Sequence, residues 1–251
     1  MESTKADPVL LLTGRKCASS NVVDEDGTRV FRVRGEAIAV SERANVQDNT
    51  GFIVWDAALA LTKYLEENAS RMVREGCMAT SPSSSSSKRT VIELGAGTGL
   101  VGLASAKLFR GSDCVLTDLP VVVPQLEKNI RLNEGVCSAV SARPLDWSWS
   151  AERVRENFAD VADSVTLVLA SDCVWLRDQT KDFVKVAALL CGGGLKGGGA
   201  SAKLVVAQQR RSAALEDALR RELEAAGFRD AAPKVADDSA NLRIWELELC
   251  L

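Results

Sequence analysis

The chain has 251 residues, of which 46% are hydrophobic and 26% are charged, and its formal net charge at pH 7 is −3. This composition is typical of a globular protein that can bury a large core. It lacks the basic surplus of proteins that bind nucleic acids electrostatically, and no stretch approaches the roughly 20 apolar residues of a membrane-spanning helix. We therefore expect neither a nucleic acid nor a membrane among the partners.

Seven cysteines are scattered along the chain without a CxxC pair, and histidine is absent. We therefore predict no metal site and no imidazole base. Several of the cysteines lie in apolar stretches, as buried reduced thiols do in intracellular proteins. The predicted location is the cytoplasm, with the nucleus as a second location.

The first 50 residues predict a polar tail followed by a β-hairpin. Apolar and polar residues alternate on both sides of Arg34, Gly35 and Glu36, which is the pattern of two antiparallel strands. We therefore interpret residues 1–50 as an N-terminal tail and hairpin extension, and residues 51–251 as the main domain.

Residues 51–90 predict a helix followed by a loop. Apolar side chains at Val54, Ala58, Leu61 and Leu65 share one helical face. Residues 79–89 contain a run of serines and predict a flexible loop. A solvated linker and a phosphorylated regulatory segment are both compatible with this composition.

A strand, a glycine-rich turn and a helix follow one another at residues 91–109. Residues 91–94 are an apolar run, and Gly95, Gly97 and Gly99 come directly after it. Glycines allow positive φ angles and close approach of a ligand to the backbone. This unit is typical of the first strand and helix of an open α/β sheet that binds a nucleotide-like ligand.

Further strands and helices alternate through the rest of the chain. Apolar runs predict strands at residues 114–119, 140–145, 165–172 and 203–209, with helices between them. Strands near 228–235 and 241–250 have no helix between them, so they are expected to form an antiparallel hairpin. The fold class is therefore α/β, with a seven-stranded, mostly parallel, Rossmann-like sheet and helices on both faces.

Acidic and aromatic residues stand where the predicted parallel strands end. Asp118, Asp146, Trp147 and Asp172 all occupy such positions. In an open parallel sheet the ligand lies at the carboxyl ends of the strands, so these side chains are expected to meet there. Asp118 and Asp172 could instead cap the helices that follow them.

The glycine turn permits two interpretations. The segment from Gly97 to Gly102 matches the dinucleotide pattern GxGxxG. In a dinucleotide site, however, the first glycine directly follows the strand; that glycine is Gly95 here, and the sixth residue counted from it is Leu100. We therefore assign Gly102 to helix packing and regard the turn as one with an acid, Glu93, two residues before its first glycine.

That turn resembles motif I of the S-adenosylmethionine-dependent methyltransferases, and further motifs follow in the same order. They are VWDAAL at 54–59, ELGAGTGLVG at 93–102, TDLP at 117–120, NIRLN at 129–133, LDW at 145–147 and SDCVW at 171–175. The series is similar to the family-16 methyltransferases, the methyltransferase-like 21 group of protein-lysine methyltransferases. The resemblance covers roughly residues 30–250 and implies that residues 51–251 form a class I methyltransferase domain.

The resemblance also implies roles for individual residues. Asp172 and Trp175 are expected at the substrate mouth as the catalytic pair, although the family more often has tyrosine or phenylalanine where Trp175 stands. The residues expected to bind the cofactor S-adenosylmethionine are Trp55, Glu93, Gly95, Ala96, Gly97, Gly99, Asp118, Asp146, Trp147 and Ser171. Of these, Glu93 is expected near the amino group of the cofactor and Asp118 at its ribose hydroxyls.

The expected function is N-methylation of a lysine side chain in a protein. Asp172 would orient the amine, and Trp175 would hold it by cation–π attraction. The family resemblance suggests a chaperone, an ATPase or a translation factor as the protein partner. A small-molecule amine as substrate and a catalytically silent binding module remain alternatives. Arg210 and Arg211 are interpreted as the solvated start of a helix, with substrate contact as the alternative.

Overall fold

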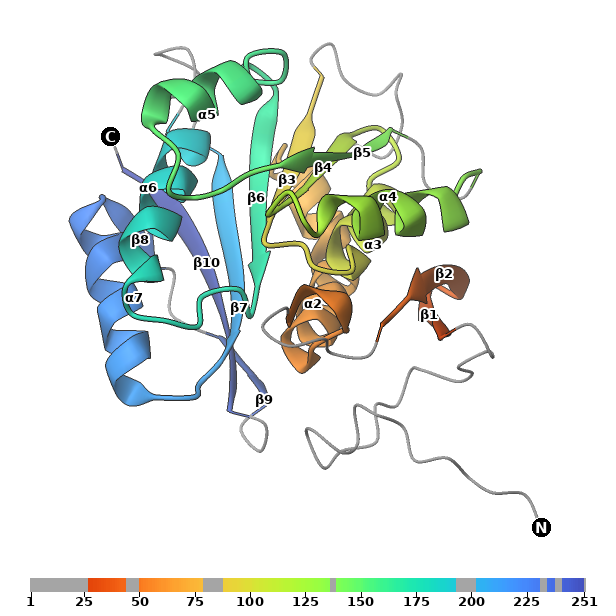
Figure 1. The fold of residues 1–251 in the computed structure, drawn as a ribbon, viewed down its shortest axis with the longest axis horizontal. Coiled ribbons are helices and arrows are strands. Elements are labelled where there is room, and N and C mark those ends of the chain that lie inside the picture. Colours follow the sequence, from red (N-terminus) through yellow and green to blue (C-terminus); the bar gives the residue numbers. More distant parts are fainter. Residues whose placement is uncertain are drawn as a thin grey trace.

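The computed structural model describes residues 27–43, 50–78, 88–135, 139–192, 202–230, 234–237 and 241–250. Within these ranges the chain forms a central sheet between two layers of helices (Figure 1). The predicted tail and most of the predicted serine-rich loop lie outside the described residues. Among the described residues, no helix has both the length and the hydrophobicity needed to cross a membrane.

Five parallel strands form the larger part of the sheet, in the order β5-β4-β3-β6-β7. They are buried between the two helical layers, which explains why several of them appear in the sequence as nearly continuous apolar runs. Their bounds are β3 Thr90–Leu94, β4 Asp113–Asp118, β5 Val140–Pro144, β6 Val165–Ser171 and β7 Lys203–Gln209.

The C-terminal strands complete the sheet in antiparallel orientation, as predicted. Strand β10 (Leu242–Leu249) lies between β7 and the short strand β8 (Phe228–Asp230). A further strand, β9 (Lys234–Asp237), pairs with the other end of β10. Both described parts of the predicted hairpin strand at residues 228–235 therefore pair with β10.

Three helices cover each face of the sheet (Figure 1). Helices α2 (Asp56–Arg74), α3 (Leu100–Leu108) and α4 (Val123–Leu132) pack on one face, and α5 (Ala151–Asn157), α6 (Gln179–Cys191) and α7 (Ala213–Ala225) on the other. Helix α2 continues beyond the predicted residue 65, because Ala69 and Met72 extend its buried stripe. Gly102 lets α3 approach the sheet, since a Cβ there would lie 1.8 Å from Cδ2 of Leu116.

The predicted N-terminal hairpin is present and is docked on α4. Strands β1 (Thr28–Val33) and β2 (Glu36–Ser41) are joined by Arg34 and Gly35, both at positive φ as in a type I′ turn. The side-chain oxygen of Asn129 accepts from the amide of Ser41 at 2.9 Å, and that of Asn133 accepts from the amide of Ala39 at 3.0 Å. The two asparagines, one helical turn apart, therefore bind the edge of β2 as a neighbouring strand would.

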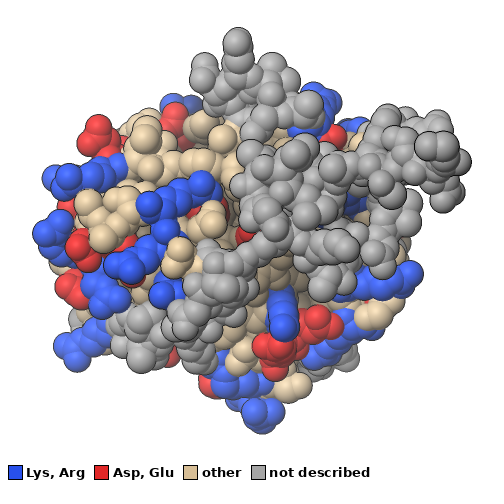
Figure 2. Space-filling view, turned by 90° about the horizontal axis from the view of Figure 1, so that it is seen from below, with Lys and Arg blue, Asp and Glu red and all other residues tan. Residues whose placement is uncertain are grey.

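Charges of both signs are distributed over the described surface. Figure 2 shows Lys and Arg side chains next to Asp and Glu side chains on the face seen from below in Figure 1. This distribution agrees with the nearly balanced charge of the sequence.

Candidate active site

A cavity of about 780 Å³ opens at the carboxyl ends of the parallel strands. Its size is within the range of small-molecule and cofactor sites. Ten of the twelve predicted site residues line it, namely Trp55, Gly95, Ala96, Gly97, Asp118, Asp146, Trp147, Ser171, Asp172 and Trp175. Elements far apart in the sequence are therefore brought together, as the strand-end argument predicts.

The glycine turn forms the floor of this cavity. Gly95 and Gly97 have φ angles of 61° and 57°, which favour glycine. A Cβ on Gly95 would lie 2.6 Å from Cβ of Cys173, and one on Gly97 would lie 3.2 Å from the carbonyl oxygen of Gly51. The glycines are thus required by the neighbouring chain as well as by the backbone conformation.

Asp118 holds the turn from the end of β4. Its Oδ2 accepts from the amide of Gly97 at 2.8 Å, and its Oδ1 accepts from the amide of Leu119 at 2.7 Å. Burial raises the pKa of Asp118, although these two hydrogen bonds lower it. Helix α4 begins after Val122, without a side-chain cap, so Asp118 is bound to the glycine turn and does not cap that helix.

Glu93 and Gly99 lie outside the cavity, unlike the other predicted site residues. Oε2 of Glu93 accepts from the amide of Gly102 at 2.8 Å, so its carboxyl group is buried beneath α3. Burial raises the pKa of Glu93 to about 8. Gly99 precedes α3, and a Cβ on it would meet Leu116 and Leu126 at 3.0 Å. Both residues support the turn from behind, and the expected place of Glu93 near the amino group of the cofactor stays a prediction.

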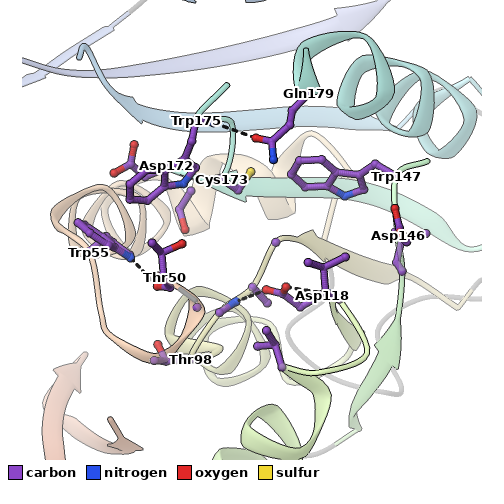
Figure 3. A pocket seen from close by; sticks show the side chains of 18 of the residues that line it. Thr50, Trp55, Thr98, Asp118, Asp146, Trp147, Asp172, Cys173, Trp175 and Gln179 are labelled. Atoms are coloured by element: carbon purple, nitrogen blue, oxygen red, sulfur yellow. Dashed lines mark hydrogen bonds between the residues drawn. The ribbon is translucent and has the colours of Figure 1, made fainter. Parts of the chain in front are cut away.

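One end of the cavity carries Trp147 and Asp146 (Figure 3). The Trp147 ring packs edge-on against Phe183, with ring centroids 5.3 Å apart. Oδ1 of Asp146 accepts from the amide of Ser148 at 2.9 Å, and hydrogen bonds from Ser148 lower the pKa of Asp146. This end therefore offers an apolar ring beside an ionised carboxylate.

Two indoles meet at the other end of the cavity (Figure 3). The rings of Trp55 and Trp175 are 4.9 Å apart, with an interplanar angle of 78°. Trp55 stands at the start of α2 and donates its indole N–H to the carbonyl oxygen of Thr50 at 3.0 Å. The backbone amide of Trp175 donates to the side chain of Gln179 at 3.3 Å. The Trp55 ring is therefore fixed by its own N–H, and the backbone of Trp175 is fixed by Gln179.

Asp172 lies beside this aromatic pair in a strained and buried position. Its φ angle is 47°, and only 3% of its surface is exposed. Its backbone amide donates to the carbonyl oxygen of Ala207 at 2.8 Å. Burial raises the pKa of Asp172, and the neighbouring Arg211 lowers it. Asp178, not Asp172, precedes α6, so the helix-cap interpretation of Asp172 does not hold.

The partner of Asp172 is Arg211, which our sequence analysis favoured as a solvated residue. Its guanidinium Nη2 donates to Oδ2 of Asp172 and lies over the rings of Trp175 and Trp55, at 4.2 and 5.3 Å from their centroids. The only sequence signal was its place two residues after the end of β7, on the rim that carries the ligand. Cys173 also lines the cavity, but burial raises the pKa of its thiol well above the ordinary value, so it stays protonated at neutral pH.

Comparison with known proteins assigns the chain to a family. A family model described as lysine methyltransferase matches residues 36–218, well over half of the chain. The chain belongs to this family of lysine methyltransferases. The resemblance inferred from the motifs is thereby confirmed.

Several curated relatives are similar to the chain over part of their length. The chain is 32% identical over 139 residues to EEF1A lysine methyltransferase 3 of Xenopus tropicalis, covering 55% of this chain and 52% of the relative. It is 31% identical over 141 residues to protein N-lysine methyltransferase METTL21A of Mus musculus, covering 55% of each chain. It is 35% identical over 140 residues to protein-lysine N-methyltransferase EFM6 of Saccharomyces cerevisiae, covering 53% of this chain and 54% of the relative. The chain thus spans about half the length of the curated relatives it matches.

Solved methyltransferase structures share the fold. Magnesium protoporphyrin IX methyltransferase from Synechocystis PCC 6803, with bound S-adenosylmethionine, is 14% identical and superimposes with a TM-score of 0.52, covering 82% of this chain and 87% of that one. SMU.776, complexed with S-adenosylhomocysteine, is 12% identical with a TM-score of 0.54, covering 90% of this chain and 57% of that one. The predicted Rossmann-like fold is therefore confirmed.

Proposed function

We propose that the chain is an S-adenosylmethionine-dependent methyltransferase that N-methylates a lysine side chain of a protein. The observation that carries the proposal is a single cavity with Trp147 and Asp146 at one end and Asp172 and Trp175 at the other. The chain that forms it belongs to the lysine methyltransferase family. A glycine turn held by Asp118 lies between the Trp147 end and the mouth formed by Asp172 and Trp175 (Figure 3).

The residues present fit this cofactor. A carboxylate at Asp118 suits a pair of ribose hydroxyls, and Trp147 beside Asp146 suits an adenine ring with its amino group. Five aspartates and no lysine or arginine occur among the described residues that line the cavity, which suits a ligand with a positively charged sulfur. Trp55, Gly95, Ala96, Gly97 and Ser171 complete the predicted set among the residues that line the cavity.

S-adenosylmethionine supplies a methyl carbon on a sulfonium sulfur, and its transfer to an amine nitrogen releases S-adenosylhomocysteine and one proton. Because this methyl group is already electrophilic, the chain needs to align the amine and exclude water. Asp172 and Trp175 lie where an amine entering the cavity would be oriented. A lysine must be uncharged to react, and with a pKa near 10.4 its deprotonation at pH 7 costs about 4–5 kcal/mol. Desolvation beside the two indoles lowers that cost.

The relatives support a protein as the substrate. Their names refer to EEF1A and to calmodulin as the methylated proteins. A chaperone, an ATPase or a translation factor as the specific partner stays a prediction, as does the cytoplasmic location, which imaging of the tagged chain in cells would check.

Labelled cofactor tests the proposal. The protein is incubated with methyl-labelled S-adenosylmethionine and a lysate freed of its own small molecules. We expect label in a protein band that yields methyl-lysine on hydrolysis, lost with Asp172→Ala and kept with the control Asp217→Ala on the exposed face of α7.

Three outcomes would contradict the proposal in different ways. If calorimetry shows no binding of S-adenosylmethionine, this cofactor is excluded. Binding without transfer would indicate a silent module. Label confined to a small-molecule fraction, when that fraction is supplied, would indicate a metabolite substrate.

A further inference from the structure

A cation that belongs to the chain lies against three residues that line the mouth of the cavity. The guanidinium of Arg211 is paired with Asp172 and lies over Trp175 and Trp55. A carboxylate with aromatic faces is the environment that proteins use for ammonium groups. Arg211 therefore occupies the contacts that our sequence analysis assigned to the substrate amine.

Three separate segments build this arrangement. Trp55 precedes α2, Asp172 and Trp175 follow β6, and Arg211 follows β7. The carboxyl group of Asp172 also accepts from the backbone amide of Gln209 at 3.4 Å. The ion pair is mostly sheltered, since the side chain of Asp172 is 2% exposed and that of Arg211 is 32% exposed. An ion pair at such a site is screened much less than one on the surface.

Apart from Asp172, the ionisable side chains that line the described cavity are acidic or neutral. The thiol of Cys173 adjoins Asp172 and remains protonated. The further ionisable residues lining the described cavity are Asp118 at the end of β4, Asp146 after β5, and Asp178 and Asp182 at the start of α6. None of them can cancel the charge of Asp172, so this falls to Arg211.

We infer that Arg211 is a positioning residue of the methyl-transfer site, which cancels the charge of Asp172 so that the mouth admits the amine in its reactive, uncharged form. The inference rests on the proposed function. An unpaired carboxylate beside the amine would favour its ammonium form, which has no lone pair for the methyl carbon. A carboxylate paired with Arg211 still accepts a hydrogen bond from a neutral amine without stabilising its charge.

A binding measurement without substrate tests the first half of this inference. Tetramethylammonium, a permanent cation, is titrated at pH 8 and constant ionic strength while tryptophan fluorescence is followed. With Arg211→Gln, the freed carboxylate and indoles should bind it about tenfold more tightly than the wild type does. Adding Asp172→Asn to that variant should remove the gain. Equal affinity in the wild type and Arg211→Gln would overturn the inference.

The pH dependence of methyl transfer tests the second half. In Arg211→Gln we expect the rate profile to move toward alkaline pH by about one unit or more, because an unpaired anion raises the pKa of a nearby amine. Arg211→Lys keeps the charge and should restore most of the wild-type profile. A rate reduced by the same factor at every pH would indicate a structural role only and would overturn the inference.

Arg210 provides the matched control. It precedes Arg211 on the same loop, but its Nε pairs with Oε2 of Glu216 at 2.6 Å. Arg210→Gln should therefore leave both the tetramethylammonium affinity and the pH profile unchanged. Calorimetry with S-adenosylmethionine should show equal cofactor affinity in all variants, which establishes that they are folded. If the wild type transfers no methyl group, the proposed function fails, while the cation titration still decides the role of Arg211.

Discussion

Replacement of Glu93 by glutamine should stabilise the protein above neutral pH. The Glu93 carboxyl group is fully buried beneath α3, and burial raises its pKa from 4.5 to about 8. Between these two values the folded chain holds a proton that the unfolded chain has already lost. The free energy of unfolding therefore falls as the pH rises through this window. A glutamine does not titrate in this range, so its contribution to the free energy of unfolding does not change with pH.

The size of this stabilisation follows from the pKa shift of Glu93 and from its Oε1 atom, which has no hydrogen-bond partner among the described residues. Each pKa unit corresponds to about 1.4 kcal/mol, so ionised Glu93 costs the folded state up to about 5 kcal/mol at pH 8.5. Glutamine keeps an oxygen for the amide of Gly102, but its NH₂ group replaces Oε1, which has no partner among the described residues. That unpaired donor costs about 1–3 kcal/mol. We expect a net stabilisation of about 2–4 kcal/mol at pH 8.5.

Urea unfolding of both proteins between pH 5 and pH 8.5 measures this difference. At pH 5 Glu93 is neutral in the folded state, so the unpaired donor dominates and Glu93→Gln should be up to about 2 kcal/mol less stable than the wild type. The difference should change in favour of the variant as the pH rises. Parallel curves for the two proteins, or a less stable variant at pH 8.5, would refute the assignment of a buried proton to Glu93.

Three further predictions concern the turn and the helix behind it. Asp118→Asn should weaken S-adenosylmethionine binding about 10- to 100-fold in calorimetry, because charge-assisted hydrogen bonds are lost. Gly95→Ala and Gly97→Ala impose similar strain at positive φ, and both should weaken cofactor binding. Only Gly95→Ala, whose Cβ would meet Cys173, should also lower the transfer rate at saturating cofactor. Gly102→Ala should lower the free energy of unfolding by about 2 kcal/mol in urea, since its Cβ overlaps the side chain packed beneath α3.

The strands of the sheet could be predicted because each one leaves a pattern in its own short stretch of sequence. Strands buried on both faces are mostly apolar, as β3 and β6 are, and such runs are visible without tertiary information. Strands β8 and β9 are short and lie along one edge of β10, so neither produces a long pattern. The described residues on both sides of 231–233 nevertheless pair with β10, as the predicted hairpin requires.

The surroundings of two residues, Glu93 and Arg211, depend on tertiary structure that the sequence does not show. Side chains alternate between the faces of a strand, so Glu93 shares a face with Val91, and that face is covered by α3. Its nearness to the glycines in sequence did not bring it to the cavity. Arg211 lies in a loop without periodicity, and its partners come from two other segments. A solvated arginine and a paired one look alike in sequence.

The cofactor turn and the substrate mouth are in direct contact through Cys173. The space where a Cβ of Gly95 would lie is filled by Cβ of Cys173, at 2.6 Å, and Cζ2 of Trp147 is 3.4 Å from the same point. Cys173 directly follows Asp172 in the chain, and the carboxyl group of Asp172 is paired with Arg211. A displacement of the turn at Gly95 therefore acts directly on Cys173, and through it on the neighbouring carboxylate of Asp172. Because interiors are close-packed, a change in the position of the glycine turn also changes the position of the Asp172 segment. The absence of a side chain at Gly95 leaves the space that Cys173 occupies.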